Sequence, residues 1–198
     1  MLPLFPLDVV LFPGLPLPLH IFEPRYKEMI GECAEARTWF GVVRAKENAL
    51  APLGCAAEIL EVVKRYDDGR MDIVTAGRRR FEVVELDNDR SFLRGEVRFF
   101  DDEPGTPLST ENARAERLHA EMTALAGGNE LPAAPDTPLS FRLAAALPTD
   151  LDFKQALLAM RSEHERITTL VEYYEAVIPK LRHMRVAQKR AGGNGHVH

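Results

Sequence analysis

The sequence of 198 residues predicts an α+β fold, in which a small twisted antiparallel β-barrel with one early helix precedes an all-helical part. Two observations support this prediction. Up to about residue 103, short apolar segments alternate with turn residues, which is typical of a barrel of short strands. Beyond that point, apolar residues recur at helical spacing. A hydrophobic fraction of 45% and a charged fraction of 28% suit a globular chain that buries a sizeable core.

The opening stretch, residues 2–26, is apolar enough to be core but is interrupted by prolines. Because proline cannot donate to a sheet ladder, this pattern favours edge strands and strand starts. The Pro13-Gly14 pair predicts a turn between strands at residues 2–7 and 15–21. Pro24 then opens a helix, since proline at the first helical position wastes no donor. The apolar stripe of that helix consists of Tyr26, Met29, Ile30 and Cys33.

Further strands are predicted at residues 38–45, 54–66, 71–75, 78–86 and 92–100. Residues 46–52 form a predicted loop, and Asp67-Asp68-Gly69 has the composition of a hairpin turn. Ala76-Gly77 predicts a break between two strands. In the last strand, Leu93, Gly95, Val97 and Phe99 alternate with charged residues, so Phe92 and Phe100 fall on the polar-facing side.

Acids, proline and glycine at residues 101–107 mark a predicted boundary, and helical patterns follow it. A helix starts at Thr106 or Ser109 and stops at Gly127-Gly128. Two short helices follow a proline-rich connector, one ending at Pro148 and one starting near residue 150. A capping box at residues 162–165 opens a long helix that Pro179 should kink or fray. The predicted domains are therefore residues 1–103 and 107–190, with a disordered tail at 191–198.

The string at residues 17–26 reads Leu-Pro-Leu-His-Ile-Phe-Glu-Pro-Arg-Tyr. It resembles the N-terminal, or substrate-binding, domain of Lon protease, and above all the stand-alone bacterial proteins that carry this domain by itself. The resemblance continues through residues 54–61, 68–70, 77–83 and 93–97, and it weakens over residues 141–165. It implies a PUA-like β pseudo-barrel, which agrees with the strand pattern. It also implies a proteolysis-related protein that recognises polypeptide.

The sequence lacks the equipment of a full Lon enzyme. An ATPase phosphate loop needs a Gly-Lys pair, and the chain contains none. The Ser-Lys dyad of Lon belongs to a separate domain without a counterpart here, and Ser140 and Lys154 are interpreted as capping and surface residues. Cys33 and Cys55 lack metal-ligand spacing, and no His-x-x-x-His pair occurs. We therefore expect no catalytic residues, no metal and no cofactor, and recognition that is ATP-independent.

The residues expected to contact a bound peptide, on condition that they are exposed, are His20, Phe22, Glu23, Arg25, Phe92 and Phe100. Trp39 is expected in the core. In the structural alternative, Glu23 caps the helix or pairs with Arg25, and His20 satisfies backbone groups. A small enzyme built around His20 is a further alternative, which the missing nucleophile disfavours.

An RNA-binding module is the main alternative function, because PUA-like folds elsewhere bind RNA. It would use Arg70 and the run Arg78-Arg79-Arg80, together with the basic C-terminal helix. Acidic neighbours can neutralise these arginines, and the net charge of −5 argues against non-specific binding to nucleic acid or an anionic membrane.

Location and partners follow from composition. No apolar run reaches the ~18 residues of a spanning helix, and the N-terminus lacks a basic leader. With two cysteines, a cytoplasmic protein is the default. The expected partners are unfolded or extended polypeptide segments and a separate protease or chaperone. The sequence leaves the ligand and the oligomeric state open.

Overall fold

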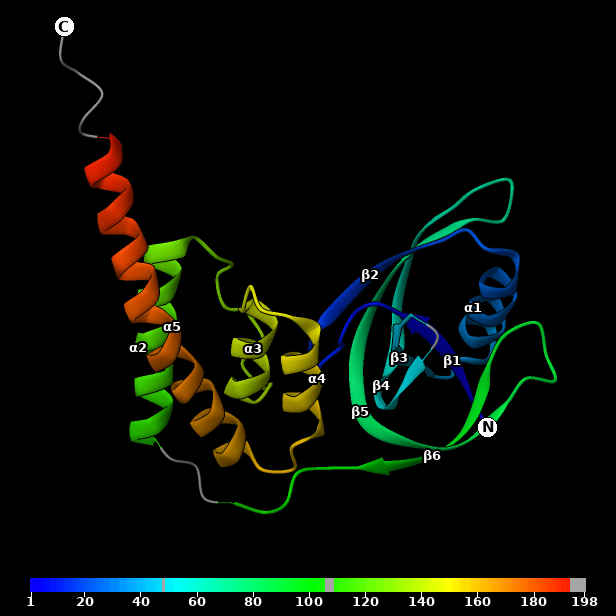
Figure 1. Cartoon of the computed structure of the whole chain (residues 1–198). Helices are drawn as coiled ribbons and strands as arrows, with labels where there is room; N and C mark the ends of the chain where they lie inside the picture. Colours follow the sequence, from blue (N-terminus) through cyan, green and yellow to red (C-terminus); the bar gives the residue numbers. More distant parts are fainter. Residues whose placement is uncertain (48, 106–108, 193–198) are drawn as a thin grey trace, which may run out of the picture. The chain divides into compact units, whose positions relative to one another are not determined.

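The computed structural model describes all residues except 48, 106–108 and 193–198 (Figure 1). It divides the chain into two compact units. The strand unit comprises Met1–Asp101, Ala134–Thr137 and Asp150–Ala159. The helical unit comprises Asp102–Ala133, Pro138–Thr149 and Met160–His198. Most of the tail expected at 191–198 lies outside the described residues. None of the described helices is both long and apolar enough to span a bilayer.

The strand unit is built on one six-stranded sheet and an early helix, α1, at Pro24–Ala36. The strands are β1 Leu2–Leu7, β2 Pro16–Ile21, β3 Phe40–Lys46, β4 Ala49–Arg65, β5 Met71–Asp87 and β6 Arg94–Phe100. Their order is β2-β5-β4-β3-β1-β6, and β6 also pairs with β5. The strands from β5 to β6 therefore close into a barrel, to which β2 is added at one end of β5 (Figure 1).

The strand pattern predicts a purely antiparallel sheet, but the observed sheet is mixed. β1 and β3 pair in parallel, with Leu4 opposite Gly41. A parallel pair needs a long connection that returns the chain to the starting end. Here β2 and α1 provide that connection.

The edge strand β2 shows why this stretch contains so many prolines. Its pairing with β5 runs from Pro16 to Ile21 without a register shift. The proline nitrogens of Pro16 and Pro18 must then lie on the outer edge, where no partner strand needs a donor. This edge consequently offers mainly acceptors to an added strand.

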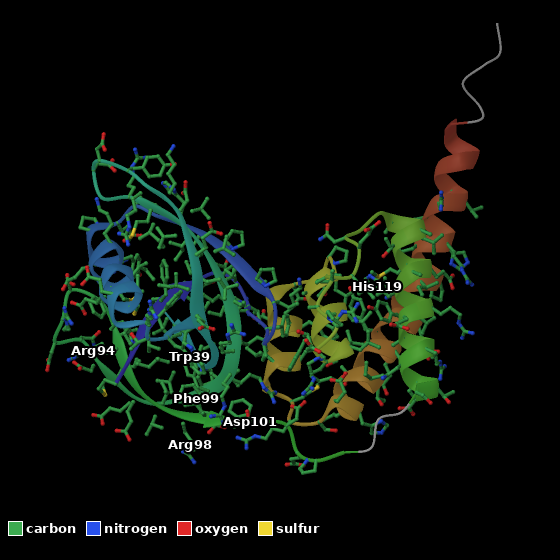
Figure 2. All side chains as sticks on the ribbon, turned by 180° about the vertical axis from the view of Figure 1, so that it is seen from behind. Trp39, Arg94, Arg98, Phe99, Asp101 and His119 are labelled. Carbon is green, nitrogen blue, oxygen red and sulfur yellow. The ribbon has the colours of Figure 1, made fainter. Side chains whose placement is uncertain are left out.

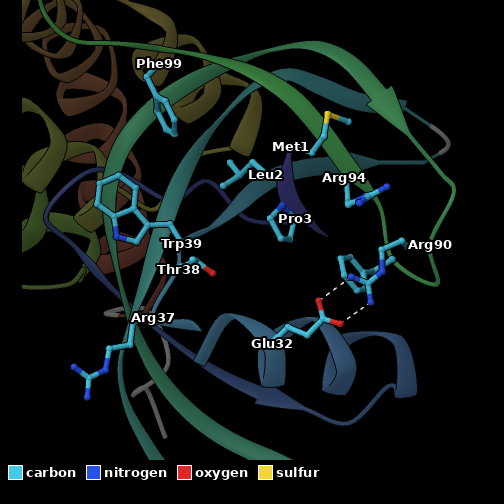
Figure 3. Close-up of a pocket in the computed structure, with 11 residues that line it drawn as sticks. Met1, Leu2, Pro3, Glu32, Arg37, Thr38, Trp39, Arg90, Arg94 and Phe99 are labelled. Carbon is cyan, nitrogen blue, oxygen red and sulfur yellow. Dashed lines mark hydrogen bonds and ion pairs between the residues drawn. The ribbon is translucent and has the colours of Figure 1, made fainter. Parts of the chain in front are cut away.

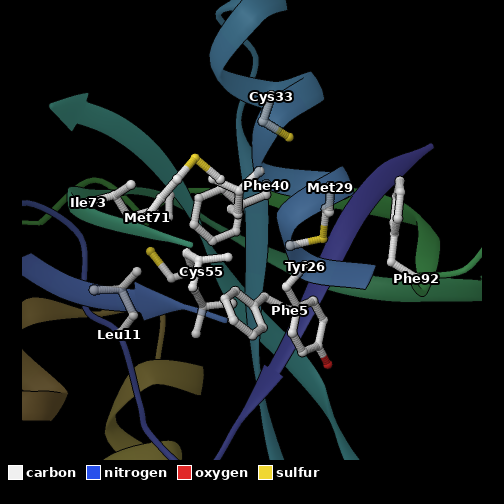
Figure 4. Packing of buried hydrophobic residues seen from close by; sticks show 14 residues of the cluster. Phe5, Leu11, Tyr26, Met29, Cys33, Phe40, Cys55, Met71, Ile73 and Phe92 are labelled. Atoms are coloured by element: carbon white, nitrogen blue, oxygen red, sulfur yellow. The ribbon is translucent and has the colours of Figure 1, made fainter. Parts of the chain in front are cut away.

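The barrel core lies between α1 and the sheet (Figure 4). Met29 and Ile30 of α1 are fully buried in it, as is Phe40 of β3. The ring of Phe5 lies 4.1 Å from that of Tyr26 and 6.2 Å from that of Phe40. The stripe predicted for α1, Tyr26 to Cys33, is the buried face of that helix.

Two details of the strands differ from prediction. β4 begins at Ala49, so the loop expected at residues 46–52 is mostly strand. β5 runs unbroken through Gly77, where a break was expected. Gly77 donates to the Leu15 carbonyl at 2.9 Å and accepts from the Gly14 N–H at 2.9 Å. A Cβ at this position would lie 2.2 Å from the Phe12 carbonyl oxygen, so glycine is required by close approach of backbone.

The helix α4, Leu151–Ala159, belongs to the strand unit. Its Asp152 accepts from Arg44 at 2.6 Å and from Lys46 at 2.9 Å. Arg80, which is 3% exposed, donates to the Leu158 carbonyl at 2.9 Å. The strand unit therefore includes a helix, α4, that comes after α2 and α3 of the helical unit in the sequence.

The helical unit contains α2 Ser109–Ala126, α3 Leu139–Ala146 and α5 Glu163–Gly192. Ser162 Oγ accepts from the Glu165 N–H at 3.3 Å, as the predicted capping box requires. The α5 helix contains Pro179, where a kink or fraying is predicted, and continues beyond it. The alternative start of α2 at Thr106 lies outside the described residues.

A buried arginine, Arg166 of α5, organises the helical unit. Its guanidinium is fully buried and donates to Ser140 Oγ at 2.7 Å and to the Met160 carbonyl at 2.9 Å. It also pairs with Asp102 and Glu163, at 2.8 Å to each. Two carboxylates therefore balance the buried charge, and a hydroxyl and a carbonyl accept further hydrogen bonds from it, as burial of a charge requires.

Candidate functional site

A cavity of about 610 Å³ in the strand unit lies beside Trp39 and is called the Trp39 pocket (Figure 3). Five chain segments contribute to it: the start of β1, α1, the connection from α1 to β3, the connection before β6, and β6 itself. Its lining residues are Met1, Leu2, Pro3, Glu32, Arg37, Thr38, Trp39, Arg90, Phe92, Arg94 and Phe99.

One wall of the Trp39 pocket is aromatic. The rings of Trp39 and Phe99 meet edge to face, with centroids 6.4 Å apart. Phe99 also meets the ring of Phe81, at 6.2 Å. Both pocket aromatics are half-buried and pack on the cluster that contains Leu4 and Phe81. The barrel therefore holds this wall in place.

The opposite wall is polar (Figure 3). Arg90 donates to both oxygens of Glu32, at 2.8 and 2.5 Å, and to Glu28 at 2.7 Å. Hydrogen bonds to Glu32 and Glu28 raise the pKa of Arg90, so this side chain stays charged. Arg94 pairs with Asp87 at 2.5 Å, and its Nε is buried without a hydrogen-bond partner in the described part of the chain. The pocket thus places donors opposite an apolar wall.

Such a pocket can hold an apolar or aromatic side chain and hydrogen-bond the polar group beside it. It contains no nucleophile paired with a base. In the described residues, no group of three or more His, Cys, Asp or Glu could hold a metal ion. Burial raises the pKa of the Cys55 thiol to about 12 and raises that of Cys33, so neither cysteine is a reactive thiolate at neutral pH. The geometry of the pocket suits the binding of such a side chain.

The structure brings two of the predicted peptide-contact residues together elsewhere on the strand unit. His20 Nδ1 donates to Asp72 at 2.5 Å, and the Tyr66 hydroxyl donates to the same carboxylate at 2.8 Å. The exposed ring of Phe22 stacks on His20, with centroids 6.0 Å apart. Hydrogen bonds from His20 and then Tyr66 lower the pKa of Asp72. We call His20, Phe22, Tyr66 and Asp72 the His20 cluster.

The other predicted peptide-contact residues pair with each other or are buried. Glu23 and Arg25 pair with each other at 2.9 Å, and the Glu23 side chain makes no cap bond to α1. Phe92 is 2% exposed and Phe100 is 7% exposed. The exposure required for peptide contact is therefore absent at both, although Phe92 is among the lining residues of the Trp39 pocket.

The arginines of the RNA-binding alternative have acidic or buried surroundings. Arg70 pairs with Asp68, Arg78 with Glu58, and Arg79 with Asp101. Arg80 is buried and lies over the Phe100 ring at 4.6 Å. This run therefore does not present three solvated cations.

Sequence reasoning missed the Trp39 pocket. The sequence predicts Trp39 in the core and Phe99 on the apolar face of its strand. Both expectations are half correct, because each ring packs on the barrel with one side and lines the pocket with the other. The available signal was position: Trp39 lies in the short connection between the end of α1 at Ala36 and the start of β3 at Phe40.

Comparison with known proteins shows that residues 1–175 match the family model for the ATP-dependent protease La (LON) substrate-binding domain. A Lon protease of Parabacteroides distasonis is 32% identical over 110 residues, covering 51% of this chain and 13% of that protein. One of Cytophaga hutchinsonii is 25% identical over 201 residues, covering 91% of this chain and 24% of that protein. The chain thus spans a small fraction of the length of these relatives.

Solved structures give the same match. The crystal structure of a Lon N-terminal domain protein from Xanthomonas campestris superposes with a TM-score of 0.70 at 27% identity, covering 87% of this chain and 97% of that one. The N-terminal domain of a Mycobacterium avium complex Lon protease gives 0.61 at 18% identity, covering 88% and 97%. The second match shows the fold alone.

Proposed function

We propose, because the chain belongs to the ATP-dependent protease La (LON) substrate-binding domain family, that it recognises polypeptide segments noncovalently and catalyses no reaction itself. The matched family is the substrate-binding part of Lon and not its catalytic part. We propose further that the protein acts in the cytoplasm and passes bound segments to a separate protease or chaperone.

The observation that carries this proposal is the Trp39 pocket. The aromatic wall of Trp39 and Phe99 offers an apolar surface to a leucine or phenylalanine side chain of a bound segment. Donors at Arg94 and Thr38 lie beside it and can meet the carbonyl groups of the same segment. Exposed apolar side chains next to free carbonyl groups are what an unfolded chain presents and a folded one hides.

The free edge of β2 is a poorer binding surface. A peptide that joins a sheet as a new strand needs alternating donors and acceptors. Pro16 and Pro18 remove two donors from this edge. We therefore assign recognition to the pocket rather than to strand addition. The RNA-binding alternative is not adopted, because the arginines on which it depends are paired or buried.

The test uses Trp39 itself, which is the single tryptophan of the chain and reports directly on its own pocket. The blocked peptide acetyl-Ala-Leu-Phe-Leu-Ala-amide, which lacks tryptophan, is titrated without ATP while the Trp39 emission is followed. We expect saturable binding that Phe99→Ala weakens about 5- to 30-fold, since an aromatic contact is worth about 1–2 kcal/mol.

Phe22→Ala is the matched control, because Phe22 is an exposed aromatic residue of the strand unit outside the pocket. It should leave the affinity unchanged. Loss of binding in Phe22→Ala but not in Phe99→Ala would move the site to the His20 cluster. Absence of binding by the unmodified protein, to this peptide and to a broad peptide library, would refute polypeptide recognition.

A further inference from the structure

The helical unit has a cavity of its own, of about 490 Å³, between α2 and the segment that follows it. Its lining residues are Glu116, His119, Ala120, Thr123, Ala124, Asn129, Glu130 and Leu131. The α2 residues in this set recur at intervals of three and four, so they share one face of the helix. Figure 2 labels His119 on α2.

His119 is held in one orientation by a second helix. It is 4% exposed, and its Nδ1 lies 3.0 Å from the hydroxyl oxygen of Tyr174 on α5. Burial raises the pKa of Tyr174, so the phenol keeps its proton and donates it to Nδ1. Burial also lowers the pKa of His119, against a smaller opposite effect of the Asn129 backbone. The ring is therefore neutral, and its remaining proton is on Nε2.

Two buried polar atoms at this cavity lack a well-formed hydrogen bond within the described residues. His119 Nε2 and Thr123 Oγ1 are both buried, and neither makes a well-formed hydrogen bond within the part of the chain that the structure describes. Buried polar atoms are nearly always satisfied, and each exception needs an explanation. Here the two exceptions lie one helical turn apart and line the same cavity.

The other lining residues indicate which kind of ligand could form hydrogen bonds with His119 Nε2 and Thr123 Oγ1. Ala120, Ala124 and Leu131 provide apolar contact, and the small alanine side chains leave room for a guest. Glu116 and Glu130 are exposed and carry negative charge at the mouth. A guest should therefore be mainly apolar, should bring an acceptor for Nε2–H, and should not be an anion.

We propose that this cavity binds a small uncharged amide. Its carbonyl accepts from His119 Nε2–H, its N–H donates to Thr123 Oγ1, and its apolar body lies against the two alanines and Leu131. This inference does not rest on polypeptide recognition by the strand unit, because every residue in it belongs to the helical unit.

The experiment titrates the full chain, labelled with nitrogen-15, against three probes of similar size: N-methylbenzamide, benzoate and ethylbenzene. We expect N-methylbenzamide to shift the amide signals of Ala120, Thr123 and Leu131 with an affinity of about 1 mM, the range open to a ligand of about ten heavy atoms. Benzoate, repelled by the two glutamates, and ethylbenzene, without an acceptor, should each bind about 5-fold or more weakly.

Variants then distinguish binding in the cavity from binding elsewhere on the helix surface. Ala124→Leu should abolish the shifts by filling the cavity, and exposure of Ala124 means that the larger side chain does not disturb the fold. Ala113→Leu is the matched control, since Ala113 is an exposed alanine of α2 outside the cavity. Thr123→Val keeps the shape and should weaken amide binding about 5-fold while leaving ethylbenzene unaffected.

Three outcomes would overturn the proposal. The first is absence of shifts with about 10 mM N-methylbenzamide, well above the expected dissociation constant. The second is equal binding of benzoate and the amide. The third is binding that survives Ala124→Leu.

Discussion

The buried side chain of Arg166 connects several segments of the helical unit, and water is excluded from it. Its guanidinium has no exposure and meets two carboxylates, a hydroxyl and a carbonyl, while the Phe141 ring lies 4.2 Å from its carbon. No local pattern singles out this arginine, because Asp102 lies 64 residues earlier in the chain. Pairings across such distances follow from the fold and leave no trace in residue spacing.

Arg166→Met should therefore destabilise the helical unit strongly. Methionine fills a similar volume but leaves Asp102 and Glu163 without their shared cation, and breaking a buried pair costs about 3–5 kcal/mol. Urea unfolding followed by circular dichroism measures the loss. Arg114→Met is the control, because the Arg114–Glu175 pair is exposed and is worth about 1 kcal/mol or less. Similar midpoints for the two variants would contradict this account.

At the scale of elements, β5 was the hardest strand to predict. Ala76-Gly77 is typical of a break, yet the strand continues there and pairs with β2 and β4 on its two sides. The glycine marks a close approach of two backbones rather than a turn. A single sequence cannot distinguish the two, because both require the absence of a side chain.

Gly77→Ala should accordingly destabilise the strand unit by about 1–3 kcal/mol, the usual cost of forcing an extra methyl group into packed surroundings. Gly31→Ala is the contrasting control: nothing lies within 4 Å of its new Cβ in α1, and it should stabilise by about 0.5–1 kcal/mol. Thermal unfolding of both variants measures the difference. A neutral Gly77→Ala would mean that the Phe12 carbonyl can move aside.

The predictable part of this protein is local. The α+β class is confirmed, β1 is found at the predicted residues, and β2 starts one residue later than predicted. The proline pattern and the stripe of α1 explain these successes. Parallel pairing of β1 with β3, and the meeting of Trp39 with Phe99, depend on barrel closure and could not be predicted from spacing. Likewise His20 could be chosen from sequence, but its partner Asp72 could not.

At the scale of the whole molecule, a set of acidic groups in the strand unit has lowered pKa values. They are Glu28, Asp68, Asp72, Asp87 and Asp152. For Asp152 the cause is hydrogen bonding by Lys46 and then Arg44. A folded state with such groups binds fewer protons than the unfolded chain, so stability is fully present above the ordinary carboxyl range and decreases as pH falls through it.

Stability should thus fall between about pH 5 and pH 3, where carboxyl groups take up protons. Asp152→Asn should lower the unfolding midpoint at neutral pH, and its difference from the parent should shrink as pH falls, because the parent's carboxylate progressively takes up a proton in both states. Calorimetry across this range tests both expectations. Parallel curves for variant and parent would mean that the contacts of Asp152 contribute nothing to acid sensitivity.

The path of the chain has a consequence for synthesis. Because the strand unit takes up residues 134–137 and then 150–159, a nascent barrel has all six of its strands by Phe100 but still lacks α4. Until residue 159 has left the ribosome, the guanidinium of Arg80 has no Leu158 carbonyl to meet, and Lys46 has no Asp152. Residues 150–159 must therefore be synthesised before the contacts of the first six strands can be completed.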